Sequence, residues 1–117
     1  MQLNKCEIVL NANCSKLELE EFLTNHKKIK DWAFILHDRD NVKPHFHIYL
    51  DFGNSFIPFL EIASWFKIAP NFVNKVTGSK CDVVLYFMHF GEGQKSKFQY
   101  SINDIVSNFI NDDLDIE

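Results

Sequence analysis

Hydrophobic and polar positions alternate most clearly in residues 45–52, HFHIYLDF. Successive side chains of a strand point to opposite faces, so His45, His47 and Tyr49 share one face. The opposite face of the same strand is apolar and carries Phe46, Ile48 and Leu50. This pattern predicts a strand with one face in a hydrophobic core and two imidazoles on the other.

Four other short runs have the β-branched and aromatic content of strands, namely residues 6–12, 32–37, 71–78 and 97–101. The segment DRDNVKP separates the run 32–37 from the strand that begins at His45. Its Asp and Asn residues favour a turn, and the residue before Pro44 disfavours helix. A connection of this length suits two neighbouring antiparallel strands.

Four segments have helical signatures. Ser15 and Glu18 form a capping box that opens a helix with apolar residues at helical spacing. Residues 55–66 have a broad apolar face, with Pro58 tolerable in the first turn. A second capping signature at 79–82 opens the helical run 81–90, and residues 103–110 predict a last helix capped by Asn103 or Asp104.

Strands and helices alternate along the whole chain, without repeats, low-complexity stretches or linkers. This order predicts an α+β fold with a central antiparallel β-sheet of about five strands. We expect the helices to pack on one face of the sheet and to leave the other face open for a ligand. At this length the chain is expected to form a single domain, residues 1–117, with a short acidic tail at 111–117.

Composition limits the function classes. The net charge is −4, which by itself counts against a nucleic-acid partner. However, four of the 16 acidic residues lie in the tail, so the rest of the chain carries 12 acidic and 12 basic groups. No run is apolar and long enough to span a membrane, and the N-terminus is too polar for a secretory signal. The three cysteines have no disulfide or zinc-ribbon spacing.

The histidine pair on the strand has a chemical use. An H-x-H in a strand places two imidazoles about 7 Å apart at the α-carbons, close enough to share a metal ion. The segment HDRD ends the neighbouring predicted strand, so His37 or Asp38, together with Asp40, should reach the same sheet edge as His45. A mixed set of imidazole and carboxylate ligands suits Mn²⁺, and Mg²⁺ or Zn²⁺ are alternatives.

The helical run CDVVLYFMHF contributes a polar stripe. Asp82, Tyr86 and His89 fall on one side at helical spacing, whereas apolar residues cover much of the rest. A tyrosine in such a stripe is either a core residue with a satisfied hydroxyl or a functional group.

The combination of HDRD, KPHFHIYL and a helical YFMH about forty residues later resembles the HUH endonucleases. The resemblance is closest to the rolling-circle replication initiators of small Gram-positive plasmids, and it spans roughly residues 30–100. It implies a nuclease fold of the HUH initiator type. It also implies that His45 and His47 are paired ligands of a divalent metal, Mn²⁺ or Mg²⁺, that Asp40 and His37 complete the site, and that Tyr86 is the nucleophile.

The function implied by this resemblance is site-specific nicking of single-stranded origin DNA through a covalent 5′-phosphotyrosine, which starts rolling-circle replication. The protein would act in the cytoplasm of a bacterial host and be encoded by a plasmid or mobile element. By position in the sequence, the expected DNA contacts are Lys43, Lys80, His89 and Tyr49, the last as a stacking platform.

The chain departs from the family pattern in two respects. It has one tyrosine on the helix rather than a spaced pair, and it lacks the C-terminal oligomerisation or helicase part of complete initiators. It therefore resembles a nuclease domain alone, and any homo-oligomer would form through a part not present in this chain.

Two alternatives remain at the level of sequence. PHFHIYLD also resembles a cupin metal motif, because Asp51 follows His47 by four residues, although the capped helices disfavour a jelly roll. The second alternative is a single-strand binding module with the same fold and no nicking activity.

Overall fold

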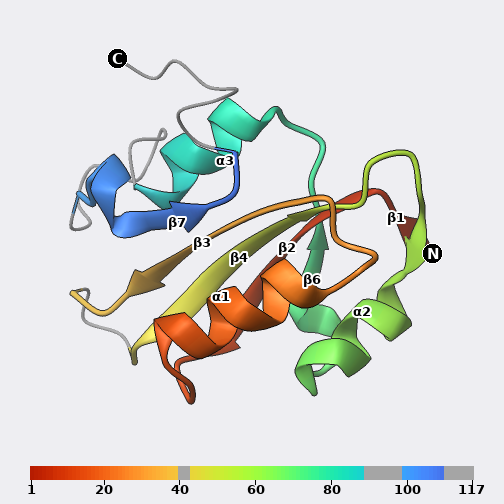
Figure 1. Ribbon diagram of the computed structural model, residues 1–117, viewed down its shortest axis with the longest axis horizontal. Helices are drawn as coiled ribbons and strands as arrows, with labels where there is room; N and C mark the ends of the chain where they lie inside the picture. The colour runs from red at the N-terminus through yellow and green to blue at the C-terminus, as the bar shows by residue number, and fades with distance from the viewer. Residues whose placement is uncertain (40–42, 89–98, 110–117) are drawn as a thin grey trace.

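A computed structural model describes residues 1–39, 43–88 and 99–109 of the chain. Its centre is a five-stranded antiparallel sheet with the strand order β6-β2-β4-β3-β7. Three helices pack on this sheet (Figure 1), which confirms the α+β class. The strands of the sheet are β2 (Lys5–Asn11), β3 (Asp31–His37), β4 (His45–Asp51), β6 (Val73–Lys75) and β7 (Ile105–Ser107), and the helices are α1 (Lys16–Asn25), α2 (Phe59–Phe66) and α3 (Lys80–Phe87).

The strand β4 lies between β2 and β3 and pairs with both along its whole length. The antiparallel register with β3 sets His37 directly opposite His45 and Ile35 opposite His47. The predicted pairing across the connection 38–44 is therefore confirmed. Side chains of directly paired residues share a face of the sheet, so this register gathers histidines from two strands on one face.

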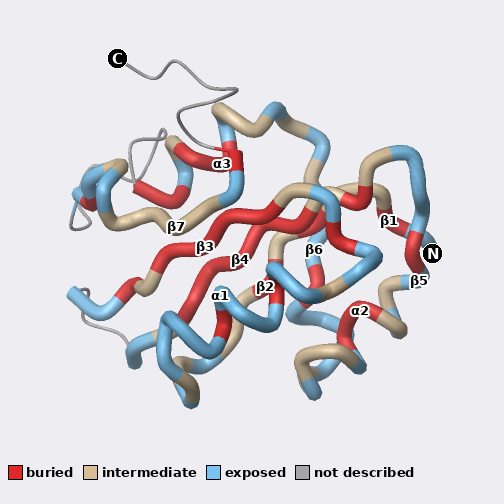
Figure 2. Tube along the Cα trace, in the orientation of Figure 1, coloured by how far each residue is buried: buried red, intermediate tan, exposed pale blue. Residues whose placement is uncertain are grey.

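The first face of the sheet forms the larger hydrophobic core. Helices α1 and α2 lie together on this side (Figure 1) and bury Leu19, Leu23 and Ile62 against it. The strands β3 and β4 are buried through most of their length (Figure 2). The apolar alternation of 45–52 thus predicts the core face correctly, since Phe46, Ile48 and Leu50 are all buried there.

The second face is not open, contrary to the expectation from the sequence. Helix α3 lies on the side of the sheet opposite to α1 and α2 (Figure 1). Its residues Val84 and Phe87 are buried with Ala33, Ile35 and Tyr49 in a second apolar cluster. This cover keeps the small and apolar residues of the histidine-bearing face out of water.

Both predicted capping boxes are present. Ser15 accepts a hydrogen bond from the Glu18 backbone N–H, and the Ser15 N–H donates to the Glu18 carboxylate. Ser79 and Asp82 make the same reciprocal pair at the start of α3. These bonds satisfy amides at the helix start that have no partner within the helix.

The second helix begins later than the sequence pattern indicates. Pro58 is its N-cap rather than a residue of its first turn, and Ile57–Pro58 form the strand β5. This strand pairs with β1 (Gln2–Leu3) in a separate two-stranded sheet. Sequence analysis missed this small sheet, because two-residue strands leave no periodic signal.

The predicted last helix, residues 103–110, is wrong. Ser101 caps a single 3-10 turn (Ile102–Asp104), and the chain then enters β7, which pairs with β3. Asn108 fixes this edge, since its side chain accepts from the Trp32 N–H at 2.8 Å and donates to the Lys30 carbonyl at 3.0 Å. The pairing of β7 with β3 thus overrides the local capping signal at Asn103 and Asp104. The strand predicted at 97–101 lies partly outside the described residues, and Gln99–Ser101 are not in a strand.

Among the described residues, no helix is long and apolar enough to cross a membrane.

The centre of β4 should dominate the stability of the fold. We expect Ile48→Ala, at a fully buried position, to reduce the free energy of unfolding by about 2–5 kcal/mol, because it removes apolar contacts and leaves a cavity. Urea denaturation monitored by circular dichroism measures this change. Leu17→Ala at an exposed position of α1 is the control and should change stability little. A loss of equal size in both variants would contradict this account of the core.

Candidate functional site

Three histidines from two neighbouring strands converge at one end of the sheet. His37 ends β3, and His45 and His47 begin β4. One ring nitrogen from each lies within 4.8 Å of the others. His37 and His47 are buried and His45 is partly exposed, so the cluster opens to solvent on one side.

Each imidazole also has a fixed acceptor on its other nitrogen. His37 Nε2 lies 2.8 Å from the Phe87 carbonyl oxygen, and His45 Nδ1 lies 2.8 Å from the Lys43 carbonyl oxygen. His47 Nδ1 lies 2.6 Å from a carboxylate oxygen of Glu7. These oxygens can only accept, so each of the three nitrogens donates a proton, and in a neutral imidazole the other nitrogen carries the lone pair that a metal ion needs.

The spacing of two of these lone pairs favours a cation. His45 Nε2 and His47 Nε2 are 3.1 Å apart. Two unprotonated nitrogens repel at this distance unless a proton or a metal ion lies between them. Nitrogens bound to one ion at about 2.0–2.1 Å each lie roughly 3 Å apart. The cluster could therefore bind a metal ion, and its outward N–H bonds to a carboxylate and to carbonyls are typical of metal-ligating histidines.

Glu7 belongs to the candidate site and was missed by the sequence analysis. It lies in β2 directly opposite Tyr49 and accepts the hydrogen bond of His47. The pair is largely shielded from solvent, with side-chain exposures of 11% for His47 and 15% for Glu7. The available signal was a carboxylate in a predicted strand, next to the apolar run 8–10.

Tyr100 is a second missed residue. Its ring stacks on His37 at 4.7 Å between centroids, with 20° between the planes. Its hydroxyl accepts a hydrogen bond from the Arg39 N–H at 3.0 Å. Tyr100 thus holds both a histidine of the cluster and the start of the segment that follows β3. It comes from a part of the chain whose local structure was predicted incorrectly.

Tyr86 of α3 lies beside the cluster. Its ring centroid is 5.9 Å from that of His47, in an edge-to-face arrangement. The side chain is 43% exposed, whereas Tyr49 and Tyr100, the other two tyrosines of the chain, are buried. Partial burial and, to a smaller extent, the negative charge of Glu7 raise the pKa of the Tyr86 phenol above its ordinary value. Tyr86 is the accessible phenol of this chain.

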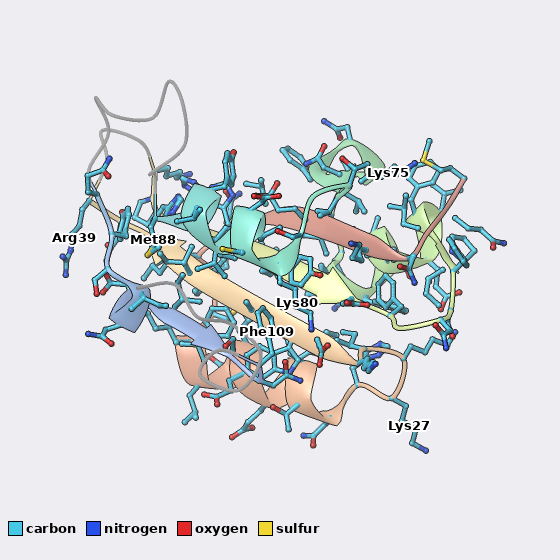
Figure 3. The ribbon with its side chains drawn as sticks, turned by 90° about the horizontal axis from the view of Figure 1, so that it is seen from above. Lys27, Arg39, Lys75, Lys80, Met88 and Phe109 are labelled. Atoms are coloured by element: carbon cyan, nitrogen blue, oxygen red, sulfur yellow. The ribbon has the colours of Figure 1, made fainter. Side chains whose placement is uncertain are left out.

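Other residues named from the sequence have different positions. Lys43 is exposed and lies close to His45. Its carbonyl oxygen accepts the hydrogen bond from His45 Nδ1–H. The Lys80 ammonium makes an ion pair with Asp31 at 2.7 Å and lies 4.8 Å from the Phe109 ring centroid. In Figure 3 Lys80 lies beside Phe109, well away from Arg39 at the histidine end of β3. Asp40 and His89 lie outside the described residues.

The proposed stacking role of Tyr49 is wrong. The side chain is fully buried under α3, in T-shaped contact with Phe109. Burial and the neighbouring Asp51 carboxylate raise the pKa of its hydroxyl, which donates to that carboxylate at 3.5 Å. A nucleobase cannot reach this ring.

The cupin alternative is also excluded. The described residues form a five-stranded sheet with three helices rather than a jelly roll. Asp51 lies at the other end of β4 from His45, where it pairs with Asp31 and Lys5 in the sheet register.

The chain belongs to the plasmid replication protein family, as its origin binding domain. The model of that family, described as "Plasmid replication protein, origin binding domain", matches residues 6–115. The chain is also similar to a replication protein of onion yellows phytoplasma, strain OY-M. The two are 35% identical over 128 aligned positions, which cover 93% of this chain and 33% of the relative. The chain thus spans about a third of the length of that relative.

The contact between Glu7 and His47 leads to a prediction about metal affinity. We expect Glu7→Ala to weaken Mn²⁺ binding by about 10- to 100-fold, because it removes the acceptor that orients His47 and raises its basicity. Glu7→Gln should lose less, since its amide oxygen still accepts from Nδ1–H. Isothermal titration calorimetry measures both affinities, and Glu20→Gln on exposed α1 is the control. Equal affinities in all variants would show that the Glu7 contact does not support a metal ligand.

Proposed function

We propose that this domain nicks single-stranded DNA at a plasmid replication origin, with Tyr86 as the nucleophile and a divalent metal, Mn²⁺ or Mg²⁺, held by His37, His45 and His47. Asp40 is proposed as a further ligand, since it follows His37 by three residues. The observation that carries the proposal is the converging histidine cluster beside the exposed phenol of Tyr86.

Family membership supports the choice of substrate. An origin binding domain implies a DNA ligand. An accessible nucleophile and a cluster suited to a cation are more than DNA binding alone requires. The replication protein of the phytoplasma supports a role in replication, and any oligomer is proposed to form through parts of a longer protein outside this chain. We propose that this function is carried out in the bacterial cytoplasm, where a plasmid origin is replicated.

The proposed reaction is a transfer of the phosphoryl group to Tyr86. The phenolic oxygen attacks the scissile phosphorus and forms the new O–P bond, while the bond from phosphorus to the 3′ oxygen breaks. The phenol loses its proton and the departing 3′ oxygen gains one, so the products are a 5′-phosphotyrosine and a free 3′-hydroxyl. The covalent intermediate conserves the energy of the phosphodiester bond, and the reverse step rejoins the strands.

The surroundings of Tyr86 define what the chemistry requires. The raised pKa keeps the phenol protonated at neutral pH, so proton removal must accompany attack. A divalent metal bound at the histidines would polarise the phosphate and stabilise the charge that develops on its oxygens. The chain itself fixes the geometry, because Glu7, Lys43 and Phe87 hold the three imidazoles.

The DNA is proposed to approach the solvent-open side of the cluster. His45 is the partly exposed member of the cluster and Lys43 lies next to it, so this ammonium can neutralise a backbone phosphate. His89 is proposed as a further contact because it follows Tyr86 by three residues. Lys80 makes an ion pair with Asp31 and is therefore not proposed as a DNA contact. The proposed path of the DNA lies at the end of the sheet that carries His37.

The nucleophile is tested by substitution of single tyrosine hydroxyls. Wild type incubated with Mn²⁺ and a pool of single-stranded oligonucleotides should give a covalent adduct that survives denaturing electrophoresis. Tyr86→Phe should abolish the adduct while anisotropy with labelled oligonucleotide shows that binding persists, because only the attacking oxygen is lost. Tyr49→Phe, which removes a buried hydroxyl, is the matched control and should retain the adduct.

A Tyr86→Phe variant that still forms adducts would rule out Tyr86 as nucleophile. Absence of an adduct from wild type, with DNA binding intact, would instead favour a binding module without nicking activity.

The metal is tested separately. The double variant His45→Ala, His47→Ala and the addition of EDTA to wild type should each abolish the adduct, since both remove the cation from the phosphate. His26→Ala is the control, because His26 lies on the other side of the fold against Trp65 and Phe22. If the double variant nicks at the wild-type rate in EDTA, the reaction does not use a metal at these histidines.

A further inference from the structure

A pocket of about 210 Å³ lies next to Tyr86, on the side toward β6. One wall comes from the sheet, where Glu7 of β2 is paired with Asn74 of β6. The opposite wall comes from α3 and the turn before it. A short segment connects β6 to α3 (Figure 1), and Val76 and Gly78 of this segment line the pocket. The lining residues are Glu7, Asn74, Lys75, Val76, Gly78, Asp82, Val83 and Tyr86.

The turn that lines the pocket is fixed by the backbone and the side chain of Lys5. The Val76 N–H donates to the Lys5 carbonyl at 3.3 Å, and Lys5 Nζ donates to the Gly78 carbonyl at 3.3 Å. Lys5 therefore fixes both ends of the turn that leads into α3. A Cβ atom at Gly78 would lie 3.1 Å from an oxygen of Asp82, so glycine leaves this part of the pocket clear.

The pocket shares residues with the histidine site. Glu7 contributes to its wall and also accepts the hydrogen bond of His47. Tyr86, beside His47, also lines the pocket. A strand of DNA whose scissile phosphate lies between Tyr86 and the histidines would therefore place an adjoining nucleotide at the pocket mouth. Its volume is below the 300–1,000 Å³ of sites for drug-sized ligands, which suits one planar ring system rather than a longer segment.

The lining combines apolar walls with hydrogen-bonding groups that can read the edge of a base. Val76, Val83 and the Tyr86 ring offer apolar contact. One oxygen of Glu7 accepts from His47 and one of Asp82 accepts from the Ser79 N–H, which leaves the second oxygen of each carboxylate as an acceptor. Asn74 has an exposed amide that can donate and accept.

We propose that this pocket receives the nucleobase that directly flanks the scissile phosphate and selects for a base edge rich in N–H donors. This inference rests on the proposed nicking function and adds a determinant of sequence preference to it. Two carboxylates favour guanine, whose N1–H and 2-amino group are adjacent donors, and also accept the amino groups of adenine and cytosine. They disfavour thymine, whose single N–H lies between two carbonyl oxygens.

The test uses nicking products from a randomised substrate. The intact chain is incubated with Mn²⁺ and single-stranded oligonucleotides randomised around the nick, and both the protein-linked and the released DNA are sequenced. Wild type should disfavour thymine by about tenfold at one position next to the nick. Asn74→Ala should reduce this preference severalfold. Asp82→Asn, which replaces an acceptor by a donor-bearing amide of the same size, should shift the preference toward thymine at that same position.

The control is Asn71→Ala, which removes an exposed amide from the 3-10 turn before β6 and outside the pocket lining. It should keep the wild-type base profile, as should positions distant from the nick in every variant. The inference is overturned if wild type nicks without a preference at either flanking position, or if Asn74→Ala and Asp82→Asn keep the wild-type profile; nicking itself then stands. Wild type that forms no adduct with any member of the pool overturns both proposals.

Discussion

The register between β3 and β4 is the constraint on which the whole site depends. His37 is paired with His45, so the last residue of one strand and the first of the next place their imidazoles on the same face. Side chains alternate with a period of two, and a slip of one residue would turn the histidines of one strand into the core side of the sheet. Phe46 and Ile48, the apolar residues of β4 on the opposite face, resist such a slip because they are buried under α1 and α2. The packing of the core on one face of the sheet thus fixes the positions of the histidines on the other face.

Helix α3 joins the two halves of the candidate site. It covers the histidine-bearing face with Val84 and Phe87, and its outer side presents Tyr86. The Phe87 carbonyl, in the last turn of the helix where no amide of the helix can reach it, accepts the hydrogen bond of His37. A single helix therefore supplies apolar cover, an acceptor for one imidazole and the phenol. Any displacement of α3 would move all three together.

Glu7 lies between the histidine cluster and the adjoining pocket and contributes to both. Its carboxylate orients His47, contributes to the raised pKa of the Tyr86 phenol and lines the adjoining pocket. Its negative charge, largely shielded from solvent, also favours a cation at the histidines. The overall charge of −4 gives no sign of this local arrangement. Net charge describes the surface as a whole, whereas the site depends on a few groups at short distance.

The sequence by itself determined the elements with strong periodic or capping signals. The alternation of residues 45–52 predicted the core face, and the capping boxes at Ser15 and Ser79 predicted the starts of α1 and α3. It also predicted that His37 or Asp38, together with Asp40, would reach the sheet edge of His45, because a short connection makes neighbouring strands antiparallel. The structure brings His37 to His45 and His47, and Asp40 lies outside the described residues. These are local or nearest-neighbour properties of the chain.

Only the tertiary structure decided the rest. The cover of the second face by α3, the burial of Tyr49 and the entry of Ile105–Ser107 into the sheet all depend on contacts between distant segments. The roles of Glu7 and Tyr100 as partners of the histidines have the same origin, since each lies 30 or more positions from the imidazole it contacts. Such contacts follow from which faces pack together, and no spacing within a single segment encodes them.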